Sequence, residues 1–315
     1  MTRSRVTVFA PATIANVGPG FDALGLAIDR PGDKLTATRT DKPGVTLQIR
    51  GSRAGLPKSP KDNVAVHVAQ LMLAELAPKL GVKLELTKGM PVGSGLGSSA
   101  ASSVAAVVAV NALLPRPLPR IDLLRFAVEG ERKASGAPHA DNVAPGLLGG
   151  VCLTRGGDPA EVVKLAAKDA FVWVVAHPHV VVKTATARKM LPRNVPLSLA
   201  ARQWANVAGL VVGLVSGNAT LVAHSCEDAI VEPVRAPLIP CFYGVKEAAL
   251  AAGALGCSIA GSGPSMFAIV KLGGPVQRVA RAMREAFRGE ARLRCDIYVS
   301  RLNRDGARIS GAARS

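Results

Sequence analysis

The chain has 315 residues, and its 49% hydrophobic and 19% charged content is enough for a globular core of one large or two ordinary domains. This composition excludes a disordered chain, and the low aromatic content of 3% indicates a core closed by small side chains. The formal net charge of +17 favours either a nucleic-acid binder or a protein that handles anionic ligands.

Strands and helices are expected in mixed order in the first half of the chain. Alternating and β-branched residues predict strands at 5–10, 35–39, 45–49 and 83–88, and again at 150–154. Helices are expected from Asn63, which can cap the first turn, to Leu76, then at 98–114 and near 121–133.

The pattern restarts after the turn-rich residues 156–159. It predicts strands at 171–176, 257–260, 266–271 and 294–299, and helices at 200–215, at 246–252 and from Val276. This order predicts a two-domain α+β protein joined near residues 155–170. The expected parts are an N-terminal domain at 1–160, a C-terminal domain at 161–302 and a loose tail at 303–315.

The basic excess is concentrated in the last expected helix. Arg278, Arg281, Arg284 and Arg288 lie at helical spacing opposite an apolar stripe, which is typical of a solvated helix face. No set of aromatic residues alternates with them as base stacking would require. We therefore expect no nucleic-acid partner.

Several features argue against a membrane or secreted protein. The longest uncharged stretch, 89–115, contains too short a continuous apolar segment to span a bilayer. The first residues lack the long apolar region of a secretory signal. The five cysteines are odd in number and show no CxxC or zinc-ligand spacing. A cytoplasmic protein with reduced thiols and no membrane partner is expected.

A glycine- and serine-rich segment, PVGSGLGSSAA at 91–101, lies between an expected strand and an expected helix. Gly93, Gly95 and Gly97 allow the backbone to wrap closely around a ligand. Ser98 and Ser99 then begin a helix whose free N–H groups favour an anion. The segment matches neither GxxxxGK[ST] nor GxGxxG. It predicts a phosphate-binding loop, with a glycine-rich turn that packs a small-residue helix as the alternative.

This loop resembles the phosphate loop of the GHMP kinases, the superfamily of galactokinase, homoserine kinase, mevalonate kinase and phosphomevalonate kinase. Other segments are similar to the homoserine kinase family in particular: APATIANVGPGFDALGLAID at 10–29, EGERKASGAPHADNVAPGLLGG at 129–150, TATARKMLP at 184–192, EPVRAPLIPCF at 232–242 and AGSGPSMFAIV at 260–270. The resemblance spans nearly the whole chain, and its segments keep the family's order and spacing.

The resemblance implies a fold, a reaction and an assembly. The fold would be α+β, with an N-terminal α+β domain that contains a left-handed βαβ unit and a ferredoxin-like C-terminal domain. The reaction would be the ATP-dependent phosphorylation of L-homoserine to O-phospho-L-homoserine, a step of threonine biosynthesis, with Mg²⁺ as cofactor. A homodimer is the assembly that the resemblance implies.

The resemblance also places the nucleotide and the metal. Ser99 and Glu131 would bind Mg²⁺, which takes few protein ligands. The residues expected at the nucleotide are Pro91, Val92, Gly93, Ser94, Gly95, Leu96, Gly97, Ser98, Ser99, Ala100, Ala101, Asn63 and Lys88. Without the resemblance, Asn63 would be interpreted as a helix cap, Lys88 as a surface lysine and Glu131 as a surface acid.

Homoserine offers an ammonium, a carboxylate and a terminal hydroxyl. By resemblance, Asp22 would bind the ammonium, and Arg188 and Arg235 the carboxylate, to which a planar guanidinium fork is suited. The other residues expected at the substrate are Asn16, His139, Asn142, Thr184 and Gly261. Each also has a purely structural interpretation, such as a turn acid for Asp22 or a helix cap for Thr184.

The expected catalytic residues are Asn142, Glu131 and Ser99. Phosphoryl transfer has a loose transition state and needs positioning and charge neutralisation more than a strong base. Relatives such as mevalonate kinase have an aspartate where this chain resembles them at Asn142. We therefore expect Asn142 to orient the hydroxyl and a γ-phosphate oxygen to take its proton, with Asp141 as the alternative base.

Other functions stay open on the sequence alone. A GHMP kinase for another small alcohol would keep the phosphate loop and change the substrate residues. A basic RNA-binding protein would bind with steep salt dependence and without ATP turnover. A catalytically inactive binding protein is a third alternative, which the presence of Ser99, Glu131, Arg188 and Arg235 argues against.

Overall fold

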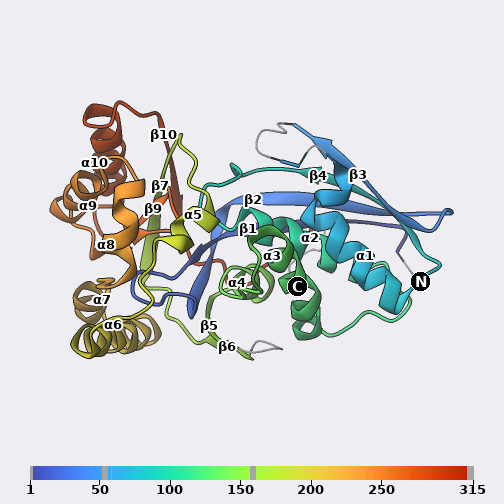
Figure 1. The fold of residues 1–315 in the computed structure, drawn as a ribbon, viewed down its shortest axis with the longest axis horizontal. Coiled ribbons are helices and arrows are strands. Elements are labelled where there is room, and N and C mark those ends of the chain that lie inside the picture. The colour runs from blue at the N-terminus through green and yellow to red at the C-terminus, as the bar shows by residue number, and fades with distance from the viewer. Residues whose placement is uncertain (1–2, 52–55, 58, 157–160, 311–315) are drawn as a thin grey trace.

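The computed structural model describes residues 3–51, 56–57, 59–156 and 161–310. Two sheets organise this part of the chain, one of seven strands and one of four. Figure 1 shows the N-terminal sheet and its helices on the right, and the C-terminal sheet and its helices on the left. The predicted two-domain α+β architecture is confirmed.

The seven-stranded sheet is mostly antiparallel. Its order is β11-β1-β2-β4-β3, and β5 and β6 extend it from β2. The strands are β1 (Arg5–Ala15), β2 (Leu24–Thr40), β3 (Gly44–Arg50), β4 (Gly81–Thr87), β5 (Val151–Arg155), β6 (Glu161–Leu165) and β11 (Arg308–Ile309). The pair β3 and β4 is parallel, and α1 (Val64–Leu76) connects the two strands, which makes a βαβ unit.

The helix after the glycine- and serine-rich loop, α2 (Ser98–Asn111), is the centre of the N-terminal domain. It packs against β1 and β2 and lies between α1, α3 (Leu124–Ser135) and α4 (Val143–Leu148). Its sequence SSAASSVAAVVAVN presents small side chains on every side, so almost the whole helix is buried. Packing on all sides fixes the position of its N-terminus.

The four-stranded sheet is antiparallel, with the order β10-β7-β9-β8. Its elements in chain order are β7 (Phe171–Pro178), α9 (Phe242–Ala251), β8 (Gly256–Ile259), β9 (Met266–Lys271), α10 (Val276–Gly289) and β10 (Cys295–Ser300). Val174 and Ala176 of β7 pack with α9 and α10, whereas Trp173 and Val175 point into the core of the other domain. The predicted ferredoxin-like domain is confirmed by this order.

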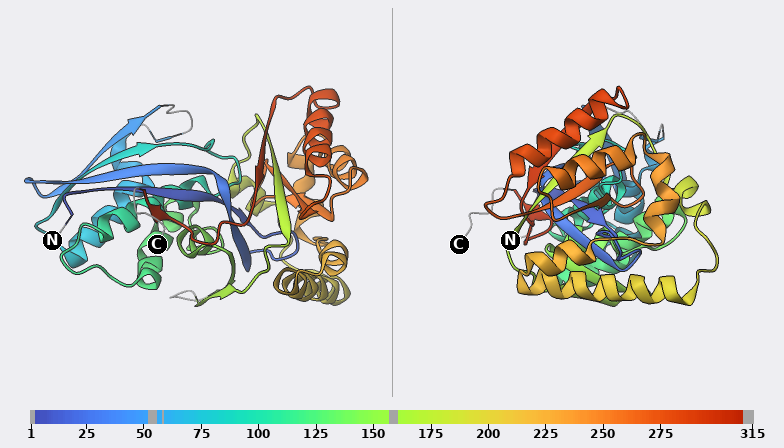
Figure 2. Two further views of the ribbon diagram at one scale, coloured as in Figure 1. Left: turned by 180° about the vertical axis from the view of Figure 1, so that it is seen from behind. Right: turned by 90° about the vertical axis from the view of Figure 1, so that its left-hand side faces the viewer.

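Four helices lie between β7 and α9: α5 (Thr184–Lys189), α6 (Leu197–Ser216), α7 (Ala219–Ser225) and α8 (Val231–Arg235). Figure 2 shows α6 and α10 at opposite ends of the C-terminal half. Short 3-10 turns occur at Pro60–Asp62, Arg120–Leu123 and Ala236–Leu238. None of the helices in the described part of the chain combines the length and the apolar composition of a membrane span.

The C-terminal segment differs from the predicted loose tail. Asn303 and Ala307 are buried, and β11 pairs with β1 at Val8 and Ile309, so the prediction is wrong for residues 303–310. Residues 311–315 lie outside the described part. The predicted domain boundary at residue 160 is also too early, because β6 pairs with β5 in the first sheet. Such short pairings depend on distant strands and leave no local pattern.

Arg120 binds the returning C-terminal segment to the first domain. Its guanidinium donates to the carbonyl oxygens of Leu147, Asp305 and Ala307. We expect Arg120→Met to lower the free energy of unfolding by about 2 kcal/mol, because partly buried carbonyls lose their donors. The exposed Arg116 in the preceding loop, changed to Met, is the control. Equal denaturant midpoints for the two variants would contradict this role.

Candidate active site

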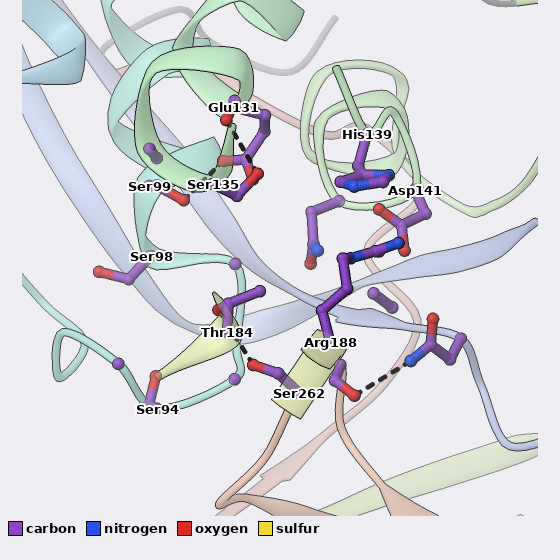
Figure 3. A pocket seen from close by; sticks show the side chains of 18 of the residues that line it. Ser94, Ser98, Ser99, Glu131, Ser135, His139, Asp141, Thr184, Arg188 and Ser262 are labelled. Atoms are coloured by element: carbon purple, nitrogen blue, oxygen red, sulfur yellow. Dashed lines mark hydrogen bonds between the residues drawn. The ribbon is translucent and has the colours of Figure 1, made fainter. Parts of the chain in front are cut away.

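A cavity of about 190 Å³ lies where the two domains meet. In Figure 3, Ser98 and Ser99 lie on one side of it, and His139, Asp141 and Arg188 on the other. The predicted site residues that line the cavity are Asn16, Asp22, Val92, Gly93, Ser94, Gly95, Gly97, Ser98, Ser99, Glu131, His139, Asn142, Thr184, Arg188, Arg235 and Gly261. Residues far apart in the sequence therefore meet in one place.

The glycine- and serine-rich loop is wound tightly against its surroundings. Gly93, Gly95 and Gly97 have φ values of 71°, 79° and 66°, a backbone conformation that favours glycine. A Cβ at Gly95 would lie 2.5 Å from the carbonyl oxygen of Ala260, and one at Gly97 would lie 2.0 Å from Thr13 Oγ1. The loop ends at the N-terminus of α2 beside the cavity, where free backbone N–H groups make an anion site.

Two residues predicted at the nucleotide, Lys88 and Asn63, do not line the cavity. Lys88 Nζ bonds to the buried carboxylate of Asp33, to Ser102 Oγ at 3.1 Å and to the carbonyl of Ser98 at 2.9 Å. It ties the strand before the loop to the helix after it. Asn63 caps α1 with its side-chain oxygen, which is the helix-cap role expected without the resemblance. The loop residues that also lie outside the cavity lining are Pro91, Leu96, Ala100 and Ala101.

Ser99 and Glu131 face each other at the ends of α2 and α3 nearest the cavity. Ser99 Oγ donates to Glu131 Oε1 at 2.5 Å. Glu131 is 7% exposed, and burial raises the pKa of its carboxyl. A hydroxyl and a buried carboxyl fit a hard divalent cation that keeps water and phosphate ligands. Among the described residues, no group of three or more His, Cys, Asp or Glu side chains is arranged to hold a metal ion.

Two predicted substrate residues pair with each other across the domain junction. Arg188 donates from both terminal nitrogens to the Asp22 carboxylate, at 2.8 and 3.0 Å. The backbone N–H of Asp22 donates to Asn16 Oδ1 at 3.2 Å. Thr184, one turn before Arg188, has its Oγ1 3.2 Å from Ser262 Oγ. The pair presents one carboxylate and one guanidinium to the cavity, which suits a ligand that carries a positive and a negative charge.

Arg235 is 3% exposed and has no ion-pair partner within 4 Å among the described residues. Its Nη1 donates to the carbonyl of Gly261 at 3.1 Å, and burial lowers the pKa of its guanidinium. The ring of Phe21, for which the sequence alone predicts no role, has its centroid 5.2 Å from Arg235 Cζ and 5.3 Å from Arg188 Cζ. A buried guanidinium without an acid favours an anionic ligand. Both guanidinium groups lie over the same ring, that of Phe21. Only its position beside Asp22 in the sequence could have indicated this.

The segment before α4 supplies the remaining polar wall. Thr13 Oγ1 donates to Asn142 Oδ1 at 2.7 Å, so the amide nitrogen is left to donate to a ligand. Burial lowers the pKa of His139, and its Nε2 is buried without a hydrogen-bond partner in the described part of the chain. Burial also raises the pKa of Asp141 to about 7. This wall therefore combines one amide donor, one neutral imidazole and one carboxyl that titrates near neutral pH.

Comparison with known proteins gives consistent matches over the chain. The GHMP kinases N terminal domain matches residues 63–150, and the GHMP kinases C terminal domain matches residues 210–289. Homoserine kinase from Chlorobium phaeobacteroides (strain BS1) is 44% identical over 96% of this chain and 99% of its own length. Homoserine kinase from Xanthomonas campestris pv. campestris is 41% identical over 96% of this chain and 92% of its own length.

Solved structures give the same match. The crystal structure of homoserine kinase from Cytophaga hutchinsonii has a TM-score of 0.93 and 48% identity, and the match covers 98% of both chains. The L. major mevalonate kinase in complex with R-mevalonate has a TM-score of 0.74 at 18% identity, over 96% of this chain and 98% of its own. At this low identity, the match to mevalonate kinase shows a shared fold and nothing more.

The raised pKa of Asp141 makes a prediction for the stability of the fold. The folded pKa of about 7 exceeds the ordinary value of 3.8, so the unfolded state loses its proton first and stability falls as pH rises between these values. We expect Asp141→Asn to unfold at a higher temperature than the parent at pH 8, by a margin that shrinks toward pH 5. The exposed Asp41, changed to Asn, is the control. A margin independent of pH would refute the shifted pKa.

Proposed function

Because the chain belongs to the homoserine kinase family of the GHMP kinases, we propose that it transfers the γ-phosphoryl group of ATP to the side-chain hydroxyl of L-homoserine. The observation that carries the proposal is the shared cavity. An anion-binding helix N-terminus borders a pocket with one acid and two arginines, as a triphosphate beside an amino acid requires. The product, O-phospho-L-homoserine, enters threonine biosynthesis.

A zwitterionic amino acid matches the charges of the second half of the cavity. Asp22 would bind the ammonium, and Arg188 and Arg235 the carboxylate. The two ligand charges would replace the contact between Asp22 and Arg188, and the carboxylate would give Arg235 the anion that it lacks. A ligand with only one of the two charges would leave one of these groups without a partner.

Mg²⁺ would be held by Ser99 and Glu131 together with phosphate oxygens. When bound, it supplies positive charge to the β- and γ-phosphates, which a loop without a lysine does not otherwise provide. The buried carboxyl of Glu131, whose partner in the described part is a hydroxyl, supports this assignment. The backbone N–H groups at the start of α2 would hold the phosphates in line with the substrate.

In the transfer step, the substrate oxygen forms a bond to the γ-phosphorus as the bond from that phosphorus to ADP breaks. Asn142 would donate its amide N–H to the substrate hydroxyl, since Thr13 already occupies the amide oxygen. The hydroxyl proton would pass to an oxygen of the transferred phosphoryl group late in the reaction. Asp141 is the alternative acceptor, and its pKa of about 7 would suit a base.

A GHMP kinase for another small alcohol is the second candidate, which the likeness to mevalonate kinase favours at the level of the fold. Mevalonate has a carboxylate but no ammonium, so Asp22 would then have no ligand partner. We also propose a homodimer, a cytoplasmic location and no nucleic-acid partner. The five cysteines are free, which supports a reducing compartment.

The substrate can be identified by ADP release from the purified chain with Mg²⁺ and ATP. We expect kcat/KM for L-homoserine to exceed that for L-serine, L-threonine and mevalonate by at least about 10-fold, because each of these alcohols misplaces the hydroxyl or lacks the ammonium. ADP release without alcohol is the control. Fastest turnover of mevalonate, or no turnover above the control, would exclude the proposed reaction.

The proton acceptor can be identified with Asp141→Asn. If a phosphate oxygen takes the proton, kcat should fall by less than about 10-fold, whereas loss of a general base typically costs about 10²–10⁴-fold. Asn142→Ala should lower kcat more than Asp141→Asn, because it removes the group that orients the hydroxyl. A fall of 100-fold or more in kcat for a folded Asp141→Asn protein would make Asp141 the base.

A further inference from the structure

Gln203 is a buried polar residue of α6 that lies outside the cavity lining. It is 7% exposed, and its side chain makes three hydrogen bonds. Nε2 donates to the carbonyl of Pro19 at 2.8 Å and to Asp228 Oδ1 at 2.9 Å, and Oε1 accepts from the backbone N–H of Ala229 at 2.8 Å. The side chain thus joins a loop of the N-terminal domain to a segment of the C-terminal domain.

The first of these segments carries the acid of the substrate pocket. Pro19 lies in the loop between Asn16 and Asp22, both of which have positive φ, 67° and 55°. Few non-glycine residues adopt this conformation without support from their surroundings. The bond from Gln203 to the carbonyl of Pro19 supports the loop at a residue that does not line the cavity.

The second segment carries the buried arginine of the pocket. Asp228 accepts hydrogen bonds from the backbone N–H groups of Ile230, Val231 and Glu232 at 2.9–3.0 Å, and so caps the start of α8. α8 has five residues and ends at Arg235. A helix this short has no stability of its own, so its cap and its packing determine where Arg235 lies.

The two segments also meet inside the cavity, at one carbonyl. Asn16 Nδ2 donates to the oxygen of Gly261 at 3.0 Å, and Arg235 Nη1 donates to the same oxygen at 3.1 Å. The two segments are therefore joined at two places. One junction is the carbonyl of Gly261 in the cavity, and the other is the Gln203 side chain, which does not line the cavity. Two junctions fix the separation of two segments, whereas one junction would act as a hinge.

We propose that Gln203 is a positioning residue that sets the separation between Asp22 and Arg235, and thereby the length of hydroxy amino acid that the enzyme accepts. The inference rests on the proposed function, in which these two residues bind the ammonium and the carboxylate. Loss of the Gln203 junction lets Asp22 and Arg235 move relative to each other and to the phosphate loop. The nucleotide half of the cavity, which α2 holds, stays in place.

The test compares Gln203→Met with Asn206→Met in steady-state kinetics. Asn206 is the matched control, because it lies on the same helix and donates to a backbone carbonyl next to Asp228, that of Glu227, without joining this segment to the Pro19 loop. We expect Gln203→Met to lower kcat/KM for L-homoserine by about 10- to 100-fold, chiefly through KM, since small displacements at a substrate have effects of this size. KM for ATP should change less than about twofold, and Asn206→Met should resemble the parent.

The ratio of kcat/KM for L-homoserine to that for L-serine, which is one methylene shorter, is the decisive readout. It should fall in Gln203→Met, whereas a general loss of folded protein would lower both values equally. Unchanged kinetics, or a parallel loss with an unchanged ratio, would overturn the proposal. If Gln203→Met does not fold, Asp228→Asn tests the same junction and should lower the same ratio. Absence of homoserine turnover in the parent chain would refute the proposed function instead.

Discussion

The active site depends on the docking of the C-terminal glycine loop onto the phosphate loop. The backbone of Gly95 lies so close to Ala260 that a methyl group would not fit, and the Ser265 N–H donates to the carbonyl of Ser94 at 3.2 Å. Gly261 in turn donates its N–H to the carbonyl of Ala15 at 3.2 Å. Neither domain alone contains both an anion site and a zwitterion site. The contact between the two loops would bring the transferred phosphoryl group and the acceptor hydroxyl into one small volume.

Burial of charge is the second constraint. Burial raises the pKa of Glu131 and of Asp141 and lowers the pKa of the Arg235 guanidinium. Asp22 and Arg188 avoid this cost by pairing with each other. A metal, a nucleotide and a zwitterion would supply the missing counter-charges, so the site is suited to binding all three ligands together.

Much of this site can be predicted from the sequence, because the patterns that indicate it are local. The glycine spacing at 93, 95 and 97 indicates a wrapped loop, and the small residues that follow indicate a buried helix. The sequence does not reveal contacts between distant residues. Lys88 has the same local pattern whether it faces a nucleotide or Asp33, which lies 55 residues away. Gln203 looks like any polar residue on a helix until Pro19 and Asp228 are seen beside it.

The most direct test of the shared cavity is a crystal structure of the chain with a non-hydrolysable ATP analogue, Mg²⁺ and L-homoserine. We expect the terminal phosphate at the N-terminus of α2, the metal between Ser99 and Glu131, and the amino-acid hydroxyl beside Asn142. The amino-acid charges should lie against Asp22 and against Arg235 with Arg188. A nucleotide bound away from the glycine loop, or an amino acid with its hydroxyl directed away from the phosphates, would contradict this arrangement.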